Sequence, residues 1–294
     1  MLAKPRESAS DGRLRRRGVI KRYAVPAYFI LTFAVAWAGC SAVILPKFLG
    51  HAPILFADLA LVALPMFFAP TLVGVSMTYL CDGTSGLKEL ASRMKRWRVG
   101  PRWYLPLSIF PAMILVSLAA LNVTVSPHFM PYVFPEGIVI GLIAGYLEEI
   151  GWMGFAFPRM QSRFGTFKSA VFIGLLQTTW HFAADFLGAS GSRGAYWLPH
   201  FLLFITSMMA MRVLLVWVYV NTKSVLMAQL MHASSTGFLS VLVPLSLSPA
   251  EDTLFYLVYS IVLILVVVLV LSEYGHELNR RSPNAGRRVG NGIW

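Results

Sequence analysis

The chain has 294 residues, of which 57% are hydrophobic and only 13% are charged. With a mean hydropathy of +0.66, this composition is that of a multi-span membrane protein and excludes a large soluble domain. The formal net charge of +12 would suit a nucleic-acid-binding protein, but the basic residues gather in short segments between apolar runs, so membrane topology explains them better. Cys40 and Cys81 lie far apart and indicate neither a disulfide framework nor a thiolate metal site.

The N-terminal residues 1–22 are rich in lysine and arginine and almost free of apolar residues before Val19. We expect them to form an unstructured basic tail on the cytoplasmic face of the membrane. A signal peptide is the rival interpretation, but the apolar run over residues 24–45 is too long for the hydrophobic region of a signal peptide. A second basic cytoplasmic tail is expected at residues 272–294.

Between the two tails, eight apolar runs are long enough to cross the bilayer as helices. They predict one all-α domain over residues 23–271, a polytopic transmembrane bundle with both termini in the cytoplasm. The polar connector over residues 82–102 is partly amphipathic and is expected at the membrane surface. The predicted spans are 23–45, 54–80, 103–124, 136–158, 168–188, 197–220, 223–244 and 252–271.

The distribution of positive charge supports this number of spans. With an even number of spans and a cytoplasmic N-terminus, all but three of the 25 lysines and arginines lie on the cytoplasmic side. The exceptions are Lys47 and Arg193 in outer loops and Arg212 within span six. We therefore expect a multi-pass protein of a cell membrane, with the bacterial inner membrane as the expected location.

Two adjacent carboxylates, Glu148 and Glu149, lie in the middle of span four, where no other charge occurs between Glu136 and Arg159. They precede Arg159 by 11 and 10 residues, which places them roughly 15–17 Å from the cytoplasmic end of the span. A charged side chain at the centre of a transmembrane helix costs about 2.5–3.5 kcal/mol on translocon-based scales, so such residues are usually functional and partnered.

Two histidines on other helices are predicted at a similar depth. His181 follows Lys168 by 13 residues on span five, roughly 20 Å in, and His232 follows Lys223 by nine residues on span seven, roughly 14 Å in. A glutamate with two histidines can bind a divalent metal such as zinc through Glu148, His181 and His232. It can equally form a metal-free cluster in which the carboxylate is a general base. Either histidine alone could be structural.

These residues resemble the CAAX prenyl-protease and bacteriocin-processing (CPBP) family of intramembrane proteases. The family pattern is EExxxR on one helix, FxxxH on a second and HxxxN, or a similar polar residue, on a third. Here the corresponding segments begin at Glu148, Gln177 and His232, in the family's order and spacing, and the resemblance covers about residues 65–240. The resemblance implies that Glu148, Glu149, His181 and His232 are the catalytic residues.

The chain departs from that pattern at three positions, where Met153 replaces the arginine, Gln177 replaces the phenylalanine, and Thr236 occupies the last polar position. The methionine leaves Glu149 without the cation expected four residues later, so Glu149 must find another cation or be protonated. Arg212, at a similar depth on span six, is a candidate to replace that arginine from a different helix. The alternative is that Arg212 extends to the cytoplasmic face.

Three further side chains are candidates for supporting roles. Asp185 follows His181 by four residues and could orient its ring, or could belong to the outer end of span five. Gln177 precedes His181 by four residues and could bond to the site or to another helix. Thr236 offers one hydroxyl for oxyanion stabilisation, where the family usually offers an amide.

The resulting prediction is an intramembrane endopeptidase in which Glu148 activates a water held by His181 and His232, with or without a metal. The resemblance adds hydrophobic or membrane-anchored substrates, such as prenylated proteins and bacteriocin- or pheromone-like peptides. A catalytically inactive family member that acts as a membrane immunity or scaffold protein is the main alternative, because of Met153, Gln177 and Thr236. A proton-coupled or metal transporter is a third alternative, because transporters also bury acids and histidines.

Overall fold

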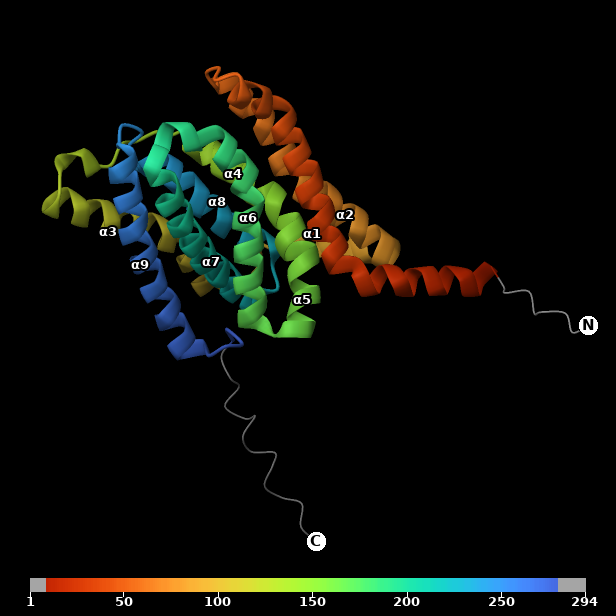
Figure 1. Cartoon of the computed structure of the whole chain (residues 1–294). Helices are drawn as coiled ribbons and strands as arrows, with labels where there is room; N and C mark the ends of the chain where they lie inside the picture. The colour runs from red at the N-terminus through yellow and green to blue at the C-terminus, as the bar shows by residue number, and fades with distance from the viewer. Residues whose placement is uncertain (1–8, 280–294) are drawn as a thin grey trace, which may run out of the picture.

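The computed structural model describes residues 9–279, and within this range the chain is helical and contains no strand. The helices form one bundle in which α4 and α8 pack together at the centre, with α1 and α2 on one side and α3 and α9 on the other (Figure 1). In chain order the α-helices are α1 (Ala9–Leu49), α2 (Phe56–Met94), α3 (Ile109–Thr124), α4 (Gly137–Gly151), α5 (Phe157–Phe164), α6 (Thr166–Arg193), α7 (Trp197–Thr222), α8 (Val225–Leu242) and α9 (Pro249–Tyr274). The 3-10 helices are Pro101–Ser108, Pro127–Phe129 and Gly194–Tyr196, and Trp152–Ala156 is a π-helical turn.

Seven helical segments in the described range are long and apolar enough to cross a membrane. The longest of them, Thr166–Thr222, contains both α6 and α7, which are joined by the short Gly194–Tyr196 turn and pack against each other. The predicted spans five and six both lie in this segment, which is why eight predicted spans correspond to seven segments. The protein is therefore a polytopic helical membrane bundle, as its composition predicts.

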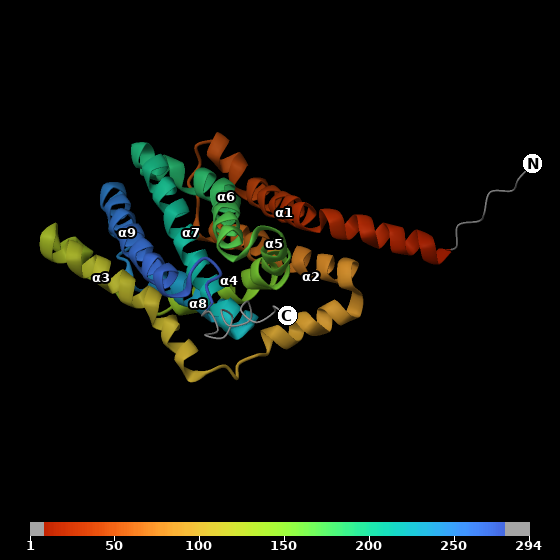
Figure 2. The same ribbon diagram turned by 90° about the horizontal axis from the view of Figure 1, so that it is seen from below.

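The two ends of the bundle differ from the prediction. α1 begins at Ala9, so residues 9–22 are helical where the sequence predicts an unstructured tail. This part of α1 extends away from the bundle (Figure 2), and its leucine and arginine residues are good helix formers that prolong an existing helix without a new nucleation step. α9 ends at Tyr274, and the rest of the predicted tails, residues 1–8 and 280–294, lies outside the described residues.

The polar connector that follows span two is also largely helical. α2 runs on to Met94 through a kink at Gly83, whose φ of 68° and ψ of −156° suit glycine because it has no Cβ. Beyond the kink, Arg93 turns back to the bundle, where its two terminal nitrogens donate to the Gly154 carbonyl and the Tyr219 hydroxyl, both at 2.9 Å. The connector therefore contacts the π-helical turn at the centre of the molecule.

The contact between α4 and α8 is close because α4 presents glycines at a four-residue spacing. At Gly145 an added Cβ would overlap the Gln229 carbonyl and the Ala233 backbone nitrogen of α8. Small residues at such positions let two membrane helices approach backbone to backbone. This approach fixes α4, which carries the two glutamates, relative to α8, which carries His232.

Gly145→Ala is therefore expected to lower the free energy of unfolding by about 1–3 kcal/mol, because the added methyl group must displace the backbone of α8. Gly191→Ala on α6 is the matched control, since an added Cβ there meets nothing within 4 Å. Thermal unfolding of both variants in detergent measures the difference. Equal unfolding temperatures for Gly145→Ala and the wild type would contradict the close packing.

Candidate active site

Glu148 and Glu149 lie in the last turn of α4, directly before the π-helical turn Trp152–Ala156. Single π turns inside α-helices are rare and are frequently found at functional sites. Both glutamates are buried, with exposed fractions of 1% and 0%. Because a buried carboxylate without partners is strongly unfavourable, the contacts of each one define its role.

Glu149 is fully engaged by two basic side chains from two other helices. Arg212 of α7 lies with Nη1 2.6 Å from Glu149 Oε2, and His232 of α8 lies with Nδ1 2.7 Å from Glu149 Oε1. Arg212 is completely buried, so it does not extend to the membrane surface. The arginine that the family places four residues after the second glutamate is thus replaced by one from α7, while Met153 is packed in the apolar core.

Glu148 has a different environment, because only one of its oxygens is bonded in the described structure. Oε2 accepts hydrogen bonds from Gln177 Nε2 at 2.9 Å and from the Trp152 indole at 3.3 Å. The Gln177 carbonyl in turn accepts a hydrogen bond from Arg212 Nη2. We refer to Glu148, Glu149, Gln177, Arg212 and His232 as the carboxylate network. Within it, Glu148 Oε1 has no bonded partner among residues 9–279.

His181 lies beside the network on α6. Its ring contacts the neighbouring Trp180 and the Phe204 ring of α7, with centroids 4.7 Å and 5.5 Å away. The ring is partly exposed, and within the described residues neither of its nitrogens has a hydrogen-bond partner. His232 therefore belongs to the carboxylate network, and His181 lies on α6 one helical turn after Gln177 of that network.

Asp185 does not orient His181. Its carboxylate accepts hydrogen bonds from the Trp197 indole at 2.8 Å and from Arg193 at 3.4 Å, at the end of the bundle where α6 turns into α7. The short turn between these helices brings Trp197 back to Asp185, and these two donors satisfy the acid. These contacts do not support the prediction that Asp185 orients His181, and they place this acid at the end of α6 that turns into α7.

Thr236 lies on α8 one helical turn after His232 and is partly exposed. Within the described residues its hydroxyl makes no hydrogen bond to the carboxylate network. Its role in oxyanion stabilisation stays a prediction.

Two aromatic residues near Glu148 were not among the predicted site residues. Trp152 follows Glu148 by four residues, a spacing that places both on one helical face and could have indicated the hydrogen bond between them. Tyr28 comes from α1, outside the predicted core of residues 65–240, and its buried ring packs edge-on against Trp152 with centroids 5.5 Å apart. Nothing in the sequence around Tyr28 relates it to the glutamates.

A metal held by Glu148, His181 and His232 requires their donor atoms to converge on one point. No group of three histidine, cysteine, aspartate or glutamate side chains in residues 9–279 has an arrangement that could hold a metal ion. The other carboxylate, Glu149, is already occupied by Arg212 and His232. The donor set as it stands does not fit a zinc site.

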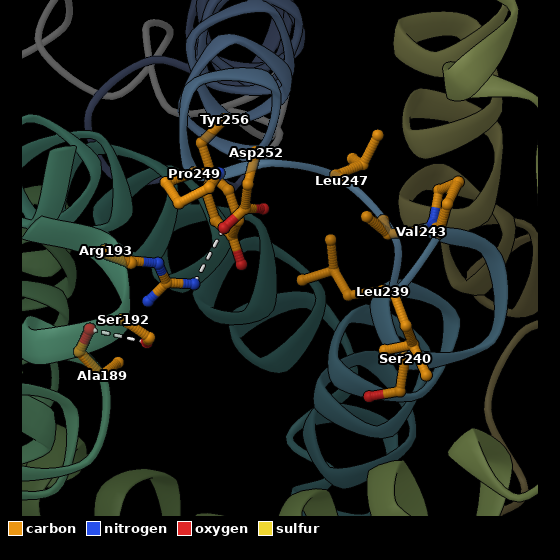
Figure 3. A pocket seen from close by; sticks show the side chains of 12 residues that line it. Ala189, Ser192, Arg193, Leu239, Ser240, Val243, Leu247, Pro249, Asp252 and Tyr256 are labelled. Atoms are coloured by element: carbon orange, nitrogen blue, oxygen red, sulfur yellow. Dashed lines mark hydrogen bonds and ion pairs between the residues drawn. The ribbon is translucent and has the colours of Figure 1, made fainter.

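A pocket of about 540 Å³ opens near the α6–α7 turn, between the ends of α6 and α8 and the start of α9 (Figure 3). One edge is polar, where Arg193 Nη2 donates to Asp252 at 2.8 Å, and the α8 side is mainly apolar. Ser240 in its wall follows His232 by eight residues, and Ala189 follows His181 by eight, or roughly 12 Å along each helix. The two helices that carry the site histidines therefore both contribute to the wall of the pocket.

Two comparisons with known proteins bear on the family of this chain. A family model described as "Type II CAAX prenyl endopeptidase Rce1-like" matches residues 130–238, a range that contains His181 and the whole carboxylate network. The chain is also 24% identical over 228 residues to the CAAX prenyl protease 2 of Methanococcus maripaludis, an alignment that covers 72% of this chain and 82% of that protein. These matches confirm the resemblance to the CPBP family of intramembrane proteases that the three helix motifs predict.

Proposed function

We propose that the protein is an endopeptidase that hydrolyses a peptide bond of a hydrophobic or membrane-anchored substrate with a water activated by Glu148. The observation that carries this proposal is the unequal bonding of the two glutamates. Glu149 is bonded through both oxygens, whereas within the described residues Glu148 is bonded through Oε2 alone and Oε1 accepts no hydrogen bond. A general base needs such a free oxygen within reach of the water that it deprotonates.

In this mechanism Glu148 Oε1 takes a proton from water as the water oxygen attacks the carbonyl carbon of the scissile bond. The proton on Glu148 then passes to the leaving amine as the carbon–nitrogen bond breaks. His232 holds its Nδ1 against Glu149, which leaves Nε2 for the water or the oxyanion. His181 offers a second ring nitrogen for the same purpose. The residues present perform each of these steps without a metal.

The substrate class follows from the location of the site in a membrane bundle. A peptide that is itself anchored in the bilayer can approach buried carboxylates from within the membrane. The matching family model is named for a CAAX prenyl endopeptidase and the relative for a CAAX prenyl protease. We propose that the pocket beside Ser240 admits the peptide chain, because it has an apolar wall and lies roughly 12 Å from the histidines along α6 and α8.

Ser240→Trp is expected to fill this pocket and to lower kcat/KM by at least about tenfold, or about 1.4 kcal/mol. Ser272→Trp on the exposed end of α9 is the matched control, because each serine donates only to a carbonyl of its own helix. Cleavage of a lipid-anchored peptide by each purified variant gives the comparison. If both variants cleave as fast as the wild type, the substrate does not pass through this pocket.

The proposed activity is tested by incubating the detergent-purified protein with a library of lipid-anchored and hydrophobic peptides and identifying fragments by mass spectrometry. We expect internal peptide bonds to be cleaved. If no peptide in the library is cleaved and the protein is folded, the inactive immunity or scaffold alternative is favoured.

A further inference from the structure

Gln177 stands where the resemblance expects a phenylalanine, and it is completely buried on the inner face of α6. A buried amide carries two donors and one acceptor, and each unbonded group costs free energy. Here both ends of the amide are used, because Nε2 donates to Glu148 Oε2 at 2.9 Å and Oε1 accepts from Arg212. The polar side chain that replaces the expected phenylalanine thus has a hydrogen-bond partner at each end of its amide.

These partners fix the orientation of the amide. Arg212 has only donors, so it must face the carbonyl oxygen of Gln177. Glu148, in the carboxylate form that the proposed general base requires, has only acceptors, so it must face the NH₂ group. The amide cannot flip without placing like groups against each other at both ends. Together with the Trp152 indole, Gln177 therefore holds Glu148 Oε2 in place, and Oε1 is the oxygen that stays free.

We propose that Gln177 is a positioning residue for the proposed reaction, which aims Glu148 at the substrate water and ties it to the buried ion pair of Arg212 and Glu149. The inference rests on the proposed function. Gln177 and Arg212 act together in this role. Arg212 donates to both Glu149 and Gln177, and Gln177 in turn donates to Glu148.

The test is Gln177→Met, which keeps the length of the side chain and removes both hydrogen bonds. The matched control is Gln229→Met on α8, since Gln229 is also buried and its amide donates to the Tyr146 carbonyl at 2.8 Å, a group outside the carboxylate network. We expect Gln177→Met to lower kcat by roughly 10- to 100-fold with little change in KM, because small displacements of a catalytic group have effects of this size. Gln229→Met should keep the kcat of the wild type.

A second kinetic comparison separates positioning from a general loss of structure. In the Glu148→Gln background, Gln177→Met should cause no further loss of kcat, because the residue that it positions no longer acts as a base. Equal kcat values for Gln177→Met and Gln229→Met would overturn the inference. So would a Gln177→Met substitution that lowers kcat by the same factor in the wild-type and Glu148→Gln backgrounds.

A spectroscopic measurement keeps the inference independent of activity. The infrared carboxylate band of Glu148, obtained as the difference between wild type and Glu148→Gln, should shift in Gln177→Met and not in Gln229→Met. An unchanged band would overturn the positioning role even if the protein cleaves peptides. A shifted band in a protein that cleaves nothing would support the contact and reject the proposed reaction.

Discussion

Arg212→Met is expected to lower the free energy of unfolding by about 3–5 kcal/mol, the usual cost of removing one partner of a buried ion pair. The reason is that Glu149 would keep His232 but lose its only permanent cation, at a position with no access to solvent. Gln177 would lose its partner as well. The unfolding temperature in detergent, compared with that of the wild type, measures the effect.

Arg193→Met is the matched control for this prediction. Arg193 also forms ion pairs, with Asp185 and Asp252, but its side chain is 23% exposed at the end of the bundle. Partly solvated pairs contribute little, so the expected loss is about 1 kcal/mol or less. Equal unfolding temperatures for Arg212→Met and Arg193→Met would show that the buried pair does not stabilise the bundle.

The double variant Arg212→Met, Met153→Arg restores the arginine at the position where the family pattern has it. Residue 153 follows Glu149 by four residues and is buried, so an arginine there can reach the same carboxylate. We expect part of the lost stability to return. A double variant less stable than Arg212→Met alone would show that the π-helical turn at Trp152–Ala156 prevents the family arrangement in this chain.

Glu148→Gln is expected to reduce kcat by about 10²- to 10⁴-fold, the usual contribution of a general base, with the fold retained. The substitution keeps an acceptor for Gln177 and Trp152, so the surrounding hydrogen bonds persist while the basic oxygen is lost. Glu136→Gln, at the exposed start of the same helix, is the control and should cleave as the wild type does.

Glu149→Gln distinguishes the two acids. Because Arg212 would then be a buried cation without its carboxylate partner, we expect this variant to have a lower free energy of unfolding than the wild type, as we expect of Arg212→Met. If Glu149→Gln is as stable as the wild type but inactive, and Glu148→Gln is active, then Glu149 and not Glu148 is the general base.

Much of this structure can be predicted from the sequence because the bilayer imposes strong constraints on composition. Apolar runs of the required length give the helices, and the cost of an intramembrane charge predicts that Glu149 is either paired with a cation, for which Arg212 is a candidate, or protonated. Depth along each helix also predicts that His181 and His232 lie in the same layer as Glu148, since the rise per residue is constant.

The details that escaped prediction depend on how helices meet. Asp185 shares a helical face with His181, but the short turn into α7 brings Trp197 and Arg193 to it instead. The kink at Gly83 and the return of Arg93 to the π-helical turn likewise depend on tertiary packing, as does the approach of Tyr28. Sequence spacing gives neighbours along one helix and says little about neighbours across the bundle.

The central claim is that Glu148 activates the water without a metal, and one cleavage assay tests it most directly. Purified wild-type protein and Glu148→Gln are each incubated in detergent with a lipid-anchored peptide, with and without a strong chelator of divalent metals. We predict that the wild type cleaves at the same rate in both conditions and that Glu148→Gln cleaves at least about 100-fold more slowly in both. Full cleavage by Glu148→Gln, or loss of wild-type cleavage with chelator and its recovery on adding zinc, would contradict the proposal.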